Sequence, residues 1–118
     1  MKIIAYRTGE KPVIENIEND IHIMQEFVGG CIEVVHPWPY DPVALVCCET
    51  GKIDGLPANR YIKNSVMNDI IAGNFFIAGI GIDDFTDIPS HLIDRYMNED
   101  FVGEKAPTYA RPKVSIWS

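Results

Sequence analysis

The alternation of apolar and polar positions predicts a series of short strands. Residues 2–7 are mostly apolar, 13–17 alternate apolar and polar side chains, and 31–37 are rich in β-branched residues. Residues 43–49 (VALVCCE) form an almost continuous apolar run, which is typical of a strand buried on both faces. The run 75–82 (FFIAGIGI) completes a predicted sheet of about five strands, and its glycines indicate a bulge or a close approach by another element.

Two segments have the spacing of amphipathic helices. In 20–28 the apolar residues fall on one face, Asn19 can cap the start, and a Gly-Gly pair ends the segment. A second helix is predicted over 89–98, and a helical turn is expected within 64–73. Because short connections join most elements, the pattern favours an α+β fold: a small, mainly antiparallel sheet with the two helices packed on one face.

The length of 118 residues predicts a single α+β domain, which we place at 1–104, followed by a C-terminal tail at 105–118. No apolar run reaches the roughly 18 residues that a membrane span requires, so we expect a cytoplasmic protein with no membrane partner. The chain has three cysteines: Cys31, Cys47 and Cys48. Because their number is odd and no C-x-x-C pair is present, we expect buried free thiols in a reducing compartment. Cys47 and Cys48 are adjacent in a predicted strand and should point to opposite faces.

The net charge of −7 is concentrated late in the chain. Segment 83–104 contains seven acidic residues against Arg95 alone, a net charge of −6. An acidic surface repels phosphate groups, so we expect no direct binding to nucleic acid. A solvated helix face or a surface for a basic partner would both explain the acids.

The chain carries no recognisable catalytic signature. We find no phosphate-binding loop, metalloprotease motif, nucleophile elbow or EF-hand spacing. His22, His36 and His91 have no second ligand at metal spacing. We therefore expect a non-enzymatic protein with no catalytic residues, no metal and no cofactor.

Three separated segments carry a family resemblance: FVGGCIEVV, ALVCCETGKIDGLPANR and DIIAGNFFIAG. Their order and spacing over about 1–100 resemble a family of small uncharacterised domains carried by phages, plasmids and conjugative elements of Gram-positive bacteria. The matching positions are Val28, Gly29, Gly30, Ile32, Glu33, Val34, Gly51, Lys52, Gly55, Leu56, Pro57, Asn59, Arg60, Asp69, Ile70, Gly73, Ile77 and Gly79. The resemblance implies a mobile-element origin and a role in host takeover or counter-defence.

The GLPANR segment at 55–60 combines structural residues with a lone cation. Its glycine and proline can set a turn, and Asn59 can hold the loop by bonding nearby backbone. Arg60 has two interpretations: an internal ion pair with Asp69, or with Asp54 in reserve, or a planar donor for a ligand carboxylate or phosphate.

The leading functional hypothesis is an accessory protein of a phage or mobile element that binds an unidentified host protein. Asp83, Asp84 and Asp87 are the candidate residues of its acidic contact surface. The alternative is a small-ligand binder that sequesters a nucleotide signal of host immunity.

In that alternative, Lys52, Asn59 and Arg60 would meet the phosphates, and Tyr61 or Trp38 would stack on the base. The oligomeric state is left open by the sequence.

Overall fold

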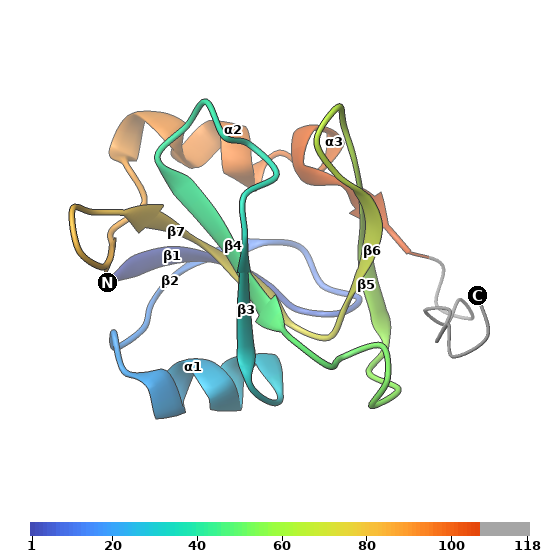
Figure 1. Ribbon diagram of the computed structural model, residues 1–118. Helices are drawn as coiled ribbons and strands as arrows, with labels where there is room; N and C mark the ends of the chain where they lie inside the picture. Colours follow the sequence, from blue (N-terminus) through green and yellow to red (C-terminus); the bar gives the residue numbers. More distant parts are fainter. Residues whose placement is uncertain (107–118) are drawn as a thin grey trace.

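A large antiparallel sheet crosses the middle of the molecule (Figure 1). The computed structural model describes residues 1–106 of the chain. The strand order is β2-β1-β7-β4-β3, and β8 pairs with β7 beside this path. The strands are β1 (Lys2–Tyr6), β2 (Val13–Asn16), β3 (Ile32–Val35), β4 (Val43–Cys48), β7 (Phe75–Ile80) and β8 (Phe85–Thr86). All these pairings are antiparallel, so the mainly antiparallel α+β class is confirmed.

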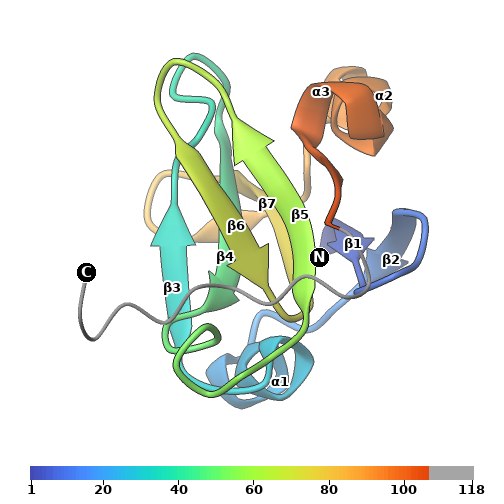
Figure 2. The ribbon, with the colours of Figure 1, turned by 90° about the vertical axis from the view of Figure 1, so that its right-hand side faces the viewer.

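A second, three-stranded sheet was not predicted. It consists of β6 (Asn68–Ala72), β5 (Ala58–Lys63) and β9 (Glu104–Lys105), in that order. Along the chain, the β5–β6 hairpin lies between β4 and β7, although β4 and β7 are adjacent in the large sheet (Figure 2). The helical turn expected in 64–73 is therefore wrong, and β5 escaped prediction because buried polar residues interrupt its apolar pattern.

The helices are short, and the second predicted helix is divided. They are α1 (Ile21–Val28), α2 (Ile93–Met97) and α3 (Glu99–Val102), with a 3₁₀ turn at Ser90–Leu92 before α2. Asp20, rather than Asn19, caps α1 by accepting from the N–H groups of His22 and Ile23. Asn98 has an extended backbone that ends α2, and its side chain caps α3. Within residues 1–106 no helix combines the length and apolar character that crossing a membrane requires.

The two faces of the large sheet carry separate cores. Ile3 and Ala5 of β1 pack with Met24 and Val28 of α1. Ile4 and its neighbours on the opposite face pack with residues of α2, α3 and the small sheet. The expectation that both helices share one face is therefore wrong, and Figure 1 shows α1 and α2 on opposite sides of the sheet. Since β4 is buried along its whole length, both of its faces need cover.

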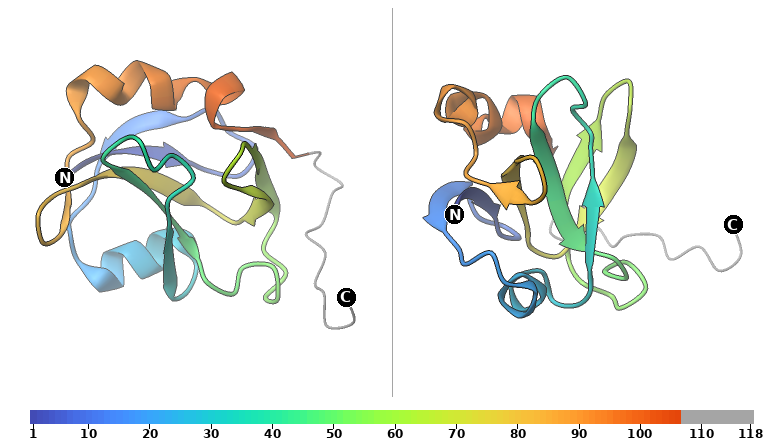
Figure 3. Two further views of the ribbon diagram at one scale, coloured as in Figure 1. Left: turned by 45° about the horizontal axis from the view of Figure 1, so that its top comes forward. Right: turned by 60° about the vertical axis from the view of Figure 1, so that its left-hand side comes forward.

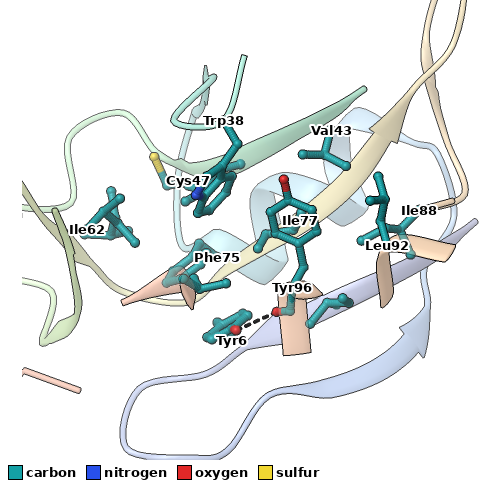
Figure 4. Packing of buried hydrophobic residues seen from close by; sticks show 14 residues of the cluster. Tyr6, Trp38, Val43, Cys47, Ile62, Phe75, Ile77, Ile88, Leu92 and Tyr96 are labelled. Carbon is teal, nitrogen blue, oxygen red and sulfur yellow. Dashed lines mark hydrogen bonds between the residues drawn. The ribbon is translucent and has the colours of Figure 1, made fainter. Parts of the chain in front are cut away.

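The core on the α2 side contains most of the buried aromatic side chains (Figure 4). Tyr6 stacks on Phe75 with ring centroids 4.9 Å apart, and its hydroxyl donates to the carbonyl of Tyr96 at 2.6 Å. Trp38 packs against the edge of Tyr96 with a centroid distance of 4.9 Å. Ile62 of β5 reaches the same cluster, so the small sheet closes one end of this core.

Strand β9 crosses the boundary that we expected between the domain and its tail, after residue 104. β9 includes Lys105, and the N–H of Ala106 donates to the carbonyl of Asn59 at 3.0 Å. The fold thus continues into the segment that we expected to be a tail. Residues 107–118 of that expected tail lie outside the described residues.

The free cysteines follow the expectation in part. Cys47 belongs to the core on the α2 side and Cys48 to the core on the α1 side, which confirms their opposite directions. Cys31 is exposed, so the prediction that all three thiols are buried is wrong at this position. Cys31 precedes β3, at the open edge of the sheet.

Candidate functional site

The GLPANR segment leads into β5, and its polar residues are interior. Asn59 is 1% exposed, and its Nδ2 donates to the carbonyls of Tyr6 and Gly73, each at 2.9 Å. These bonds join β5 to the end of β1 and to the turn that precedes β7. Asn59 therefore holds three parts of the backbone together, as its predicted structural role requires.

Arg60 is completely buried, at 0% exposure. Its Nη2 donates to Glu99 Oε1 and to the carbonyl of Glu10, both at 2.7 Å, and its Nη1 donates to Asn59 Oδ1 at 2.7 Å. The guanidinium carbon lies 5.2 Å from the centre of the Tyr6 ring. Burial raises the pKa of the Tyr6 hydroxyl, although the charge of Arg60 opposes that shift.

The predicted internal ion pair of Arg60 is confirmed, but the predicted partner is wrong. Glu99, at the start of α3, takes the place expected for Asp69 or Asp54. Asp69 lies on β6 and pairs with Lys52 instead. Asp54 accepts from the hydroxyl of Thr50 within its own turn.

The residues named for a nucleotide do not converge on one pocket. Lys52 lies in the turn between β4 and β5, beside a cavity of about 260 Å³ that neither Asn59 nor Arg60 lines. Trp38 is 1% exposed, and the hydroxyl of Tyr61 donates to Asn68. The amide of Asn59, both Nη groups of Arg60 and the ammonium of Lys52 are therefore bonded within the protein. The buried Nε of Arg60 has no hydrogen-bond partner among residues 1–106.

Asp83 and Asp84 lie at a different place, in the loop between β7 and β8. They line a depression of about 370 Å³, which we call the β7–β8 depression. Its other lining residues include Val34, His36, Ile80, Ile82 and Phe85. Val34 and Ile80 are 39% and 38% exposed, and Ile82 is fully exposed at 100%. Among residues 1–106, no ion pair involves either aspartate.

Local backbone bonds explain how this loop is shaped. The N–H of Gly81 donates to the carbonyl of Asp84 at 2.7 Å, which closes a tight turn, and Asp84 Oδ1 accepts from the N–H of Phe85. A Cβ on Gly79 would lie 2.2 Å from the carbonyl oxygen of Asp87. The close approach predicted from the glycines of this strand is confirmed at Gly79.

The acids of segment 83–104 do not act as one group. Asp87 Oδ1 accepts from the backbone N–H of Lys2 at 2.7 Å and so fixes the start of β1. Glu99 pairs with Arg60, and Asp100 and Glu104 line a separate hollow beside Tyr61. Figure 3 shows the β7–β8 hairpin at the end of the molecule away from the small sheet. Of these acids, only Asp83 and Asp84 line the β7–β8 depression.

Two findings bear on the reactivity of the described residues. Burial raises the pKa of the Cys47 thiol to about 12, so this sulfur stays protonated near neutral pH and is a poor nucleophile. Within residues 1–106, no group of three or more His, Cys, Asp or Glu side chains is arranged to hold a metal ion. What the β7–β8 depression offers is apolar surface beside uncompensated negative charge.

The sequence identified the aspartates of this site but missed its apolar part. Val34 and Ile80 belong to predicted strands, where apolar residues normally indicate core. Both nevertheless remain partly exposed, because the residues packed on this face of the sheet do not cover them. In the sequence, the one local sign of exposed apolar surface was Ile82, which stands directly before two aspartates.

Comparison with known proteins gives a family but no named function. No curated protein and no solved structure matches the chain. A family model described as "Domain of unknown function (DUF3846)" matches residues 1–100. The expected resemblance to a family of small uncharacterised domains is thereby confirmed over residues 1–100, whereas the match does not bear on the motif or on an origin in mobile elements. The chain belongs to the DUF3846 family of domains of unknown function.

Proposed function

We propose that this protein is a non-enzymatic binding protein that docks onto a partner protein through the β7–β8 depression. Its setting, in this proposal, is that of a phage or mobile-element accessory protein in the bacterial cytoplasm. The partner is then a host factor, and counter-defence is one role that such an interaction would serve.

One observation carries the proposal: exposed apolar residues lie directly beside two acids that form no ion pair within residues 1–106. Ile82 is fully exposed, and Asp83 and Asp84 follow it in the same loop. Contiguous apolar surface with a polar rim is typical of protein-binding sites. The aspartates would favour a partner with basic residues and would increase its rate of association.

Cross-linking from Ile82 tests the proposal directly. A photoreactive amino acid at position 82 should form a discrete adduct with one protein in a bacterial lysate. The double variant Asp83→Asn and Asp84→Asn should reduce the yield of that adduct at low salt, because it removes the acids that attract a basic partner. The matched control, Asp100→Asn with Glu104→Gln, removes the same charge elsewhere and should leave the yield unchanged. An adduct that is equally abundant in all three proteins would contradict the proposal.

The alternative function, a binder of a nucleotide signal, has less support. Arg60 and Asn59 are buried and bonded internally, and Lys52 pairs with Asp69. A thermal-shift screen with cyclic and linear nucleotides measures this alternative. A large stabilisation by one nucleotide would revive it and would require these side chains to rearrange.

A further inference from the structure

We propose that the partner binds as an extended segment that adds a strand to the free edge of β3, with apolar and basic side chains alternating along it. The inference rests on the proposed function and specifies how the site would recognise its partner. Strand addition joins backbone hydrogen bonds, which supply affinity, to pockets for alternate side chains, which supply specificity.

β3 is an outer strand of the large sheet: β4 pairs with it on one side, and no strand within residues 1–106 pairs with it on the other (Figure 2). In an antiparallel pair, residues that exchange hydrogen bonds alternate with residues that do not. The N–H of Glu49 donates to the carbonyl of Cys31 at 2.8 Å, which sets this alternation. The backbone groups of Glu33 and Val35 therefore face β4, and those of Ile32 and Val34 face the open edge.

One face of this edge is apolar. Val34 pairs with Val46 of β4 and borders the β7–β8 depression, together with Ile80 and Ile82. α1 packs on this face through Met24, Phe27 and Val28, while Val34 and Ile80 remain exposed, so the end near Ile80 is left open. Side chains of an added strand that point to this face would meet apolar surface.

The other face of the same edge is acidic. Glu33 pairs with Cys47 across the sheet and lines the cavity of about 260 Å³ between β4 and β6. Glu49 lines the same cavity, and both glutamates are exposed and without an ion pair among residues 1–106. Side chains that point to this face would meet two uncompensated carboxylates, which suit lysine or arginine.

The two faces together define the occupant. Successive residues of a strand point to opposite faces, so its apolar residues would alternate with basic ones. The other outer strand, β2, offers no such combination: its charged residue Glu15 is already paired with Arg7 at 2.8 Å. The charge pattern therefore selects β3 rather than β2.

Proline substitutions at the two edges test the backbone part of the inference. The probe is an acetylated and amidated octapeptide of alternating lysine and valine, and binding is measured by calorimetry. Val34→Pro removes the N–H that points to the open edge and leaves the hydrogen bonds to β4 intact. Sheets tolerate proline at such edge positions. Loss of one such bond should weaken binding of the probe about 3- to 10-fold.

Ile14→Pro is the matched control on β2. The mutual bonds of Met1 and Ile17 place the N–H of Ile14 at the outer edge of β2 by the same alternation. This variant should bind the probe as the unsubstituted protein does. Equal binding by Val34→Pro and the unsubstituted protein, with both folded, would overturn the inference.

A charge reversal provides a second test that leaves the backbone unchanged. Glu33→Lys with Glu49→Lys should weaken binding of the lysine–valine probe at least about 10-fold and favour a glutamate–valine probe instead. Unaltered preference for the lysine probe would overturn the inference even if Val34→Pro failed to fold. A dimer of the unsubstituted protein that Val34→Pro converts to a monomer would assign the edge to a second copy, which also overturns it.

The outcomes separate this inference from the proposed function. If the adduct from position 82 forms in lysate and is unchanged by Val34→Pro, docking at the β7–β8 depression stands and strand addition fails. If the probe binds at β3 but position 82 forms no adduct with any protein, the proposed function fails by itself.

Discussion

Arg60 and Asp84 are both charged residues that follow a glycine-containing turn, yet their surroundings are opposite. Arg60 is 0% exposed and bonds to Glu99, Glu10 and Asn59. Asp84 is exposed, and within residues 1–106 its carboxylate bonds only to the N–H of its neighbour Phe85. Arg60 therefore has a structural role, while the carboxylate of Asp84 is accessible to another molecule.

The difference shows that charge alone does not identify a binding residue in this protein. A buried guanidinium must be fully paired, because an uncompensated buried charge is very costly. Both Nη groups of Arg60 meet this requirement, whereas its buried Nε has no hydrogen-bond partner among residues 1–106. The exposed acids have no such requirement, and beside Ile82 they form the better candidate for contact with a partner.

The largest expected change in stability comes from removing the buried charge of Arg60. Arg60→Ala should lower the free energy of unfolding by about 3–5 kcal/mol, because it removes the donor to several buried or half-buried acceptors. Arg60→Lys should recover only part of this, since an ammonium cannot form the same planar set of bonds. Urea denaturation measures both variants.

Lys52→Ala is the control for that prediction. Its pair with Asp69 is partly exposed, so the loss should be at most about 1 kcal/mol. If Arg60→Ala cost no more than Lys52→Ala, the structural role assigned to Arg60 would be refuted. Arg60 would then become the leading candidate for ligand binding.

A smaller effect is expected at Asp41, which lies between the two extremes of exposure. Desolvation opposes ionisation of Asp41, but hydrogen bonds from Tyr96 and Arg95 outweigh it and lower the pKa of the carboxyl. A lowered folded-state pKa stabilises the protein above the unfolded value of about 3.9, and this contribution disappears as the pH falls through the folded-state pKa.

Asp41→Asn should therefore be less stable than the unsubstituted protein at pH 7. The difference between their urea midpoints should begin to shrink as the pH falls below about 4 and vanish below the lowered folded-state pKa of Asp41, where both side chains are neutral. A difference that is independent of pH would show that the charge of Asp41 does not stabilise the fold.

The elements that the sequence predicted well are those with an uninterrupted pattern. The strand expected over 43–49 is β4, and the helix expected over 20–28 is α1, with caps close to the expected positions. β5 could not be predicted from its pattern because Asn59 and Arg60 are polar residues in buried positions. Their burial depends on partners distant in the chain, such as Glu99, 39 residues after Arg60.

The placement of the helices and of the site could not be predicted for a related reason. A strand such as β4, apolar on both faces, indicates that both are covered but not by which helix. Asp83 and Asp84 were identified from charge, whereas Val34 required knowledge of the area that α1 leaves uncovered. The uncovered part of a face is a property of the assembled fold.

The smallest expected change in stability is at the exposed residue Ile82. Ile82→Ser should change the free energy of unfolding by no more than about 0.5 kcal/mol, because a fully exposed side chain contributes no buried area. Ile77→Ser, in the same strand-and-loop unit but 0% exposed, should be strongly destabilising. If urea melts show the expected contrast, Ile82 is an apolar side chain that the fold does not need. A substantial loss of stability in Ile82→Ser would instead mean that the loop packs on the protein itself, and position 82 would lose its value as evidence for a partner.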